Sequence, residues 1–113
     1  MRILVAPDSF KGTATAAEAA AAIALGARRA VNACDHAPES TVTTLPMADG
    51  GEGTAEVLAS AAVARHGIPG QTITLPTTDA VGHLTEARYQ LVGEEAFIDV
   101  AAATGLPAVS DAL

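Results

Sequence analysis

The order of apolar and polar positions predicts alternating strands and helices over the first 67 residues. Residues 2–7, "RILVAP", form a continuous apolar run of strand length, which is typical of a strand buried on both faces. Residues 40–46, "STVTTLP", form a second short run that is rich in β-branched residues. Apolar positions recur with the helical period in the longer segments 15–33 and 54–67. The pattern therefore indicates the order strand, helix, strand, helix.

Local signals mark the ends of both predicted helices. Thr15, followed three residues later by Glu18, has the spacing of a capping box at the start of the first helix. At the end of the second helix, Arg65 and His66 suit the negative end of the helix dipole, and Gly67 is a stop signal. We expect one stripe of each helix to face a sheet, namely Ile23, Ala27, Ala30 and Val31 in the first and Val57, Leu58, Ala61 and Ala62 in the second.

The hydrophobic period changes to two after residue 70. Residues 71–78 and 85–92 alternate, with "DAVGHL" as a turn between them, so an antiparallel hairpin is predicted. Residues 96–107 indicate a further strand that runs into a turn of small residues. In the hairpin, Ile73 and Leu75 share one face of their strand and Ala87, Tyr89 and Leu91 share one face of theirs, whereas Glu86, Arg88 and Gln90 point toward water.

This change of period predicts a domain boundary near residue 70. We expect residues 1–70 to form the N-terminal part of one α/β domain. Residues 71–113 are then the start of a second α/β domain that is incomplete.

Charge and composition exclude several functions. A net charge of −7 with only six Lys and Arg residues argues against nucleic acid and anionic membranes as partners. No apolar run has the length of a signal peptide core or a membrane span, so a cytoplasmic protein is predicted. Cys34, the single cysteine, permits no internal disulfide, and we expect it to be a small buried residue. His36, His66 and His83 lack metal-ligand spacing and are interpreted as surface or turn residues.

Two polar loops carry the candidate chemistry. "APDSFKGT", residues 6–13, and "MADGGEGT", residues 47–54, each follow a predicted strand and precede a predicted helix. Because ligands of open α/β sheets bind at the carboxyl ends of the strands, we expect the two loops to converge on one site.

The glycine-rich loop does not match the common nucleotide-binding motifs. No Lys-Ser or Lys-Thr pair follows the glycines as in a P-loop, and Glu56 stands where the dinucleotide fingerprint requires a third glycine.

The two acids of the glycine-rich loop also argue against a bare phosphate. An exposed helix N-terminus favours an anion by about 0.3–1 kcal/mol, whereas a carboxylate roughly 4 Å from a second anion costs about 1 kcal/mol in water and about 4 at a partly buried site.

Asp49 and Glu52 therefore predict either a divalent cation between carboxylate and phosphate, or a neutral hydroxyl that a carboxylate orients or deprotonates. The structural alternative is that Asp49 forms an Asx turn and that Glu52 lies in the first helical turn, where it suits the dipole.

The first loop supplies the opposite charge. Lys11 is the only lysine in the sequence and follows Asp8 by three residues. Lys11 can pair with a substrate carboxylate or a transferring phosphoryl oxygen, and Asp8 can bind a metal or a substrate hydroxyl. The structural alternative is a surface Asp-Lys pair that contributes at most about 1 kcal/mol, with Ser9 or Thr13 as a helix cap.

Three motifs carry a family resemblance. "APDSFKGT", "PMADGGEGTAEVL" and "IDVAAATGLP" resemble, in order and spacing, the opening third of the bacterial glycerate kinases, which transfer phosphate from ATP to a hydroxyl of glycerate. The resemblance implies two α/β domains, one flavodoxin-like and one resembling a restriction-endonuclease core, with the active site in the cleft between them. The expected fold class is thus a flavodoxin-like βαβα start with a parallel sheet, followed by the start of a second mixed α/β domain made of a β-hairpin and a strand.

The resemblance also implies that residues of both loops line the cleft, and we assign their roles by hypothesis. Lys11, Asp49 and Glu52 are the expected catalytic residues, and Asp49 and Glu52 are also the expected Mg²⁺ ligands. The expected substrate-binding residues are Asp8, Ser9, Gly50, Gly51 and Gly53. ATP and Mg²⁺ are the implied cofactors, and D-glycerate and the remainder of a longer kinase chain are the implied partners. The alternative is a catalytically inactive fragment that at most binds small hydroxy acids or a partner surface.

Overall fold

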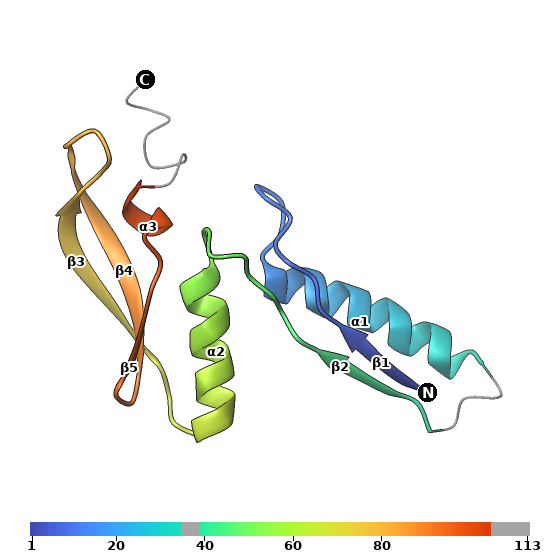
Figure 1. Cartoon of the computed structure of the whole chain (residues 1–113). Helices are drawn as coiled ribbons and strands as arrows, with labels where there is room; N and C mark the ends of the chain where they lie inside the picture. Colours follow the sequence, from blue (N-terminus) through green and yellow to red (C-terminus); the bar gives the residue numbers. More distant parts are fainter. Residues whose placement is uncertain (35–38, 105–113) are drawn as a thin grey trace. The chain divides into compact units, whose positions relative to one another are not determined.

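The computed structural model describes residues 1–34 and 39–104 (Figure 1). His36 and the end of the third motif, residues 105–107, lie outside the described residues. The chain divides into two compact units, Met1–Ala48 and Asp49–Leu113, and each is described here by itself. The domain boundary near residue 70 stays a prediction. Within residues 1–34 and 39–104, no helix is long and apolar enough to cross a membrane.

The first unit is a βαβ element. Strand β1 (Arg2–Val5) and strand β2 (Thr41–Thr44) pair in parallel, and helix α1 (Ala16–Asn32) connects them (Figure 1). Val5 packs with Ala20 and Ala24 of the helix, and Ile3 and Val42 surround this contact. The predicted parallel α/β start is confirmed, but β1 is not buried on both faces as expected, because Leu4 is 63% exposed.

Helix α1 begins as predicted but turns a different face to the sheet. Thr15 Oγ1 accepts a hydrogen bond from the Glu18 amide at 3.1 Å, and the Glu18 carboxylate accepts one from the Thr15 amide at 2.8 Å, which completes the capping box. The buried residues are Ala16, Ala19, Ala20 and Ala24. Ile23 is 47% exposed and Ala30 is also exposed, so their predicted burial was wrong. Because apolar residues occupy nearly every face of this helix, periodicity did not distinguish the stripe of smallest side chains.

The second unit packs one helix on an antiparallel sheet. Helix α2 (Thr54–His66) precedes strands β3 (Gln71–Thr78), β4 (Leu84–Val92) and β5 (Glu95–Ile98), and the short helix α3 (Ala101–Thr104) follows. The three strands pair in the order β3-β4-β5, so the predicted hairpin and further strand are confirmed (Figure 1). Ala59 and Ala62 of α2 contact Val92, and Val63 and Phe97 pack around them.

The buried faces in this unit also differ from the expectation. Ala62 is buried as predicted, whereas Leu58 is 48% exposed and Ala61 is exposed. Helix α2 lies against the sheet face that carries Val92, and residues two positions apart in a strand share a face. Gln90 therefore lies on the helix-covered face and is half-buried, whereas a solvent-facing position was predicted.

Asp79 organises the turn of the β3–β4 hairpin. Its side chain is 7% exposed, and Oδ1 accepts hydrogen bonds from the amides of Val81 at 2.9 Å and His83 at 2.8 Å. The backbone hydrogen bond from His83 is the main cause that lowers the pKa of the Asp79 carboxyl below its ordinary value. Gly82 has a φ of +88°, which favours glycine at this position. His83 is thus a turn residue, as predicted.

Glu95 joins the end of α2 to the β4–β5 turn. Arg65 Nη2 donates to both carboxylate oxygens at 2.9 and 3.1 Å, and His66 Nε2 lies 2.7 Å from Oε1. The hydrogen bond with His66 and the Arg65 guanidinium lower the pKa of Glu95 below its ordinary value. We call these three residues the Glu95 cluster.

The Glu95 cluster predicts a pH dependence of stability. Because the folded-state pKa lies below the ordinary value of 4.5, the stabilisation is present above that pH and is lost as the pH falls through the folded-state value. We expect Glu95→Gln to flatten the decrease in the free energy of unfolding between about pH 6 and about pH 3, measured by urea denaturation. Glu86→Gln, at an exposed position of β4, is the control that should retain the parent's pH dependence. Equal slopes for Glu95→Gln and the parent would contradict this role.

Candidate functional site

The two polar loops start from the same edge of the parallel sheet. The Leu45 amide donates to the Val5 carbonyl at 2.8 Å and the Met47 amide donates to the Pro7 carbonyl at 2.9 Å, so strand pairing continues past β1 and β2. Both loops therefore leave the carboxyl ends of their strands, as predicted. Asp49 belongs to the second unit. The convergence of the two loops on one site stays a prediction.

The first loop closes into a tight turn around Lys11. The amide and carbonyl of Phe10 exchange hydrogen bonds with Ala14, each 2.9 Å long, and the Thr13 amide also donates to Phe10 at 2.8 Å. Gly12 has a φ of +75°, a conformation that L side chains rarely adopt. The exposed side chain of Lys11 stands within this turn.

Asp8, Ser9 and Lys11 are all exposed. Asp8 Oδ1 accepts a hydrogen bond from the Ser9 amide at 2.6 Å. In the part of the chain that the structure describes, no ion pair joins Asp8 to Lys11. The cap of α1 is Thr15, whereas Ser9 or Thr13 was the alternative considered from the sequence. The surface ion pair considered for Lys11 and the helix-cap role considered for Ser9 or Thr13 are therefore not seen.

The glycine-rich loop is shaped by hydrogen bonds between the side chains of Asp49 and Thr54 and the loop backbone. Asp49 Oδ1 accepts a hydrogen bond from the Gly51 amide at 3.1 Å, so the predicted Asx turn is present. Thr54 Oγ1 accepts from the Gly50 amide at 3.1 Å and donates to the Gly51 carbonyl at 2.7 Å. Gly50 and Gly53 have φ values of +99° and +88°. These contacts give Asp49 a structural role, and they leave the Asp49 carboxylate exposed.

The start of α2 has no side-chain cap. Gly53 is the N-cap residue and no side chain accepts a hydrogen bond from the first turn. Glu52 precedes this cap, so the acid in the first turn is Glu56 and the predicted alternative for Glu52 does not apply. Uncapped amides at a helix N-terminus attract anions. An exposed carboxylate at position 52 beside such amides can attract a cation that accompanies the anion.

Asp49 and Glu52 are the carboxylates of the glycine-rich loop that could hold a Mg²⁺ ion. Among residues 1–34 and 39–104, no group of three or more His, Cys, Asp or Glu residues could hold a metal. Mg²⁺ is usually bound through one or two carboxylates, together with water and substrate phosphates. Asp49 and Glu52 offer carboxylates of this kind.

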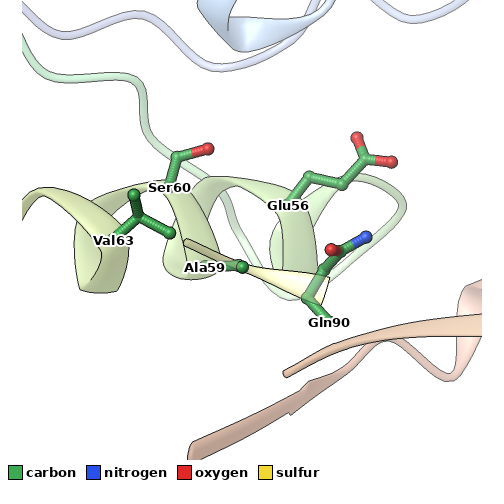
Figure 2. Close-up of a pocket in the computed structure, with 6 residues that line it drawn as sticks. Glu56, Ala59, Ser60, Val63 and Gln90 are labelled. Atoms are coloured by element: carbon green, nitrogen blue, oxygen red, sulfur yellow. The ribbon is translucent and has the colours of Figure 1, made fainter. Parts of the chain in front are cut away.

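A separate groove lies in the second unit, between α2, Gly70 just before β3, and Gln90 of β4 (Figure 2). Its volume is ≈ 330 Å³, and it is lined by Glu56, Ala59, Ser60, Val63, Gly70 and Gln90. Sequence reasoning missed this groove because Gln90 was expected to face water. The lining contains a carboxylate, a hydroxyl and an amide but no cation, so the groove does not suit a phosphate group.

Cys34 is exposed, so its predicted burial was wrong. It lies two residues beyond the end of α1 and lines an apolar cavity of ≈ 210 Å³ together with Met1, Ile3 and three residues of the helix. Because Cys34 follows the helix, the α1–sheet contact does not cover it.

The fold and the two loops define an α/β protein with polar loops at the carboxyl ends of a parallel strand pair. The profile of the glycerate kinase family matches residues 3–113. The chain therefore belongs to the glycerate kinase family.

Individual relatives agree with this assignment. The chain is 38% identical over 106 residues to the glycerate kinase of Halalkalibacterium halodurans, which covers 92% of this chain and 25% of that protein. It is also 38% identical to the glycerate kinase of Haemophilus influenzae, with 94% of this chain and 25% of the relative covered. A solved structure of a putative glycerate kinase 2 from Salmonella typhimurium has a TM-score of 0.70 and 39% identity, and the match covers 100% of this chain and 28% of that one. The chain thus spans about a quarter of the length of these curated relatives.

The glycines of the loop and of α1 predict opposite effects on stability. An alanine at position 53 would have to adopt a positive φ, so Gly53→Ala should lower the free energy of unfolding by about 1–2 kcal/mol. Gly26 lies inside α1, and no atom lies within 4 Å of an added Cβ. Gly26→Ala, the matched control, should therefore raise the free energy of unfolding by about 0.5–1 kcal/mol. Urea denaturation measures the free energy of unfolding of both variants. If both substitutions change it in the same direction, the positive φ at Gly53 is contradicted.

Proposed function

We propose that this chain is the N-terminal part of a glycerate kinase, which transfers the terminal phosphoryl group of ATP to a hydroxyl of D-glycerate and forms phosphoglycerate. The observation that carries the proposal is the family match over residues 3–113, which includes both polar loops in one continuous span. The exposed lysine, the exposed acids and the uncapped start of α2 support it, since phosphoryl transfer depends mainly on positioning and electrostatics.

Lys11 supplies positive charge to the proposed site. Its exposed ammonium pairs with no acid of the described residues. In the proposed reaction it neutralises charge on the glycerate carboxylate or on the transferring phosphoryl group. Asp8 and Ser9, which precede it in the same loop, bind substrate hydroxyl groups by hydrogen bonds.

The glycine-rich loop supplies the remaining parts of the proposed site. Gly50, Gly51 and Gly53 carry no side chain, so a phosphoryl oxygen can approach the uncapped amides at the start of α2 closely. Asp49 and Glu52 hold Mg²⁺ or orient the accepting hydroxyl. When bound, Mg²⁺ neutralises charge on the phosphate oxygens.

Charge removal in a full-length kinase that carries this segment tests the proposed roles. We expect Lys11→Met and Asp49→Asn each to lower kcat/KM for glycerate by about 100-fold or more, because each removes a charge that acts on the transferring group. The asparagine keeps the oxygen that accepts the Gly51 amide, so Asp49→Asn isolates the charge from the turn. Arg88→Met and Glu86→Gln, at exposed positions of β4, are charge-matched controls that should stay near the parent rate.

The measurement is ATP-dependent formation of phosphoglycerate at several glycerate concentrations. If Lys11→Met and Asp49→Asn both remain within a few fold of the parent, these residues do not act on the reacting groups. A decrease of the same size in Arg88→Met and Glu86→Gln would indicate a general loss of structure.

The second candidate function is a catalytically inactive fragment that at most binds small hydroxy acids. It is favoured by one observation, namely that the chain spans about a quarter of the curated relatives. The 113-residue chain with ATP, Mg²⁺ and D-glycerate should then show no turnover, while the full-length kinase forms phosphoglycerate under the same conditions. Turnover by the chain alone would contradict this candidate, provided that Lys11→Met abolishes it.

A further inference from the structure

One face of the three-stranded sheet in the second unit is apolar across all three strands. Ile73 on β3 pairs with Tyr89 on β4, which in turn pairs with Ile98 on β5. Directly paired residues of antiparallel strands lie on the same face, so these three side chains form a row. The residues that we call the apolar face are Ile73, Leu75, Ala87, Tyr89, Leu91 and Ile98.

The apolar face lies opposite the one that α2 covers. Helix α2 contacts Val92 and Phe97, which belong to the other set of alternating positions, and it runs along one side of the sheet (Figure 1). The exposed fractions are 51% for Leu75 and 70% for Ile98. Ile73, Ala87, Tyr89 and Leu91 are half-buried, so in the described part of the chain solvent reaches the apolar face mainly at Leu75 and Ile98.

Charged residues are absent from this face over the three strands. Its positions are Gln71, Ile73, Leu75, Thr77, Thr85, Ala87, Tyr89, Leu91, Ala96 and Ile98. The opposite face carries Glu86, Arg88 and Glu95. In antiparallel sheets the charged positions normally mark the solvated face and the apolar positions the packed face. The uncovered side thus has the composition of a packed face.

We propose that a helix from the downstream part of the full-length kinase chain packs across the apolar face. The chain spans about a quarter of its curated relatives, so the full-length proteins contain about three times as much further chain that can cover it. Contiguous exposed apolar patches mark contact surfaces, and α/β proteins cover their sheets with helices. The inference rests on membership of the glycerate kinase family, and it goes beyond the proposed phosphorylation of glycerate.

The dimensions of the row favour a single helix as the occupant. The row from Ile73 through Tyr89 to Ile98 spans two strand spacings, which is about 10 Å. A helix with its side chains has a diameter of about 10–12 Å. Because no charge lies on this face, the contacting stripe of the helix is expected to be apolar as well.

Thiol accessibility in the full-length kinase tests the proposal. Leu75→Cys is made in a background in which Cys34 and any other cysteines are replaced by serine, and its reaction rate with a maleimide is compared with that of Thr74→Cys. Thr74 is exposed on the opposite face of the same strand and is the matched control. We expect the thiol at position 75 to react at least about tenfold more slowly than that at position 74, and the two to react equally in denaturant.

Ile98→Cys provides the same measurement if Leu75→Cys fails to fold. A photoreactive side chain at position 75 identifies the occupant, and we expect intramolecular cross-links to residues downstream of position 113, mapped by mass spectrometry.

Equal reaction rates at positions 74 and 75 would overturn the proposal. Protection that is lost on dilution, with cross-links between molecules, would also overturn it and would assign the face to a second copy. Both readouts are independent of kinase activity, so they stand whether or not glycerate is the substrate.

Discussion

Both units depend on the same physical contact, in which small side chains of a helix pack against a valine of a strand. In the first unit Ala20 and Ala24 contact Val5, and in the second Ala59 and Ala62 contact Val92. Because alanine has only one side-chain carbon, the helix backbone can lie close to the sheet and bury apolar surface in a thin layer. Among the described residues, Val92 is the largest side chain that is fully buried, which shows how thin these cores are.

These thin cores leave the larger apolar side chains outside. Leu25 and Leu58 are about half exposed at 48% each, and Leu4 is 63% exposed. Burial of a leucine side chain stabilises a fold by about 1.5–3 kcal/mol, so such positions represent stabilisation that the described contacts do not yet use. Additional chain that buried these leucines would stabilise the fold, as we propose for the apolar face. The curated relatives contain such additional chain, since this chain spans about a quarter of their length.

The candidate site has a different physical basis, because its loops are shaped by hydrogen bonds within each loop. The Phe10–Ala14 bonds shape the lysine loop, and the Asp49 and Thr54 bonds shape the glycine-rich loop. Motifs of this kind are local in sequence, so the capping box, the Asx turn and the glycine positions were predictable from the residues themselves. The exposure of Lys11 and the position of Glu52 before the helix cap needed the three-dimensional structure, since neighbouring residues offered each of them a plausible structural role.

Short-range chemistry along the chain was sufficient for the order of strands and helices, their approximate ends, the hairpin and the two polar loops. Tertiary packing decided which faces are buried. Ile23 and Leu58 were expected inside and are exposed, because alanine on nearly every side of the helices allowed several possible stripes. Cys34 was also expected inside and is exposed, because it lies beyond the end of α1. Gln90 was expected in water and lies beside α2, because the end of its strand carries Val92 on the same face and that valine holds the helix. Strand alternation specifies two faces, but only the packed helix determines which one it covers.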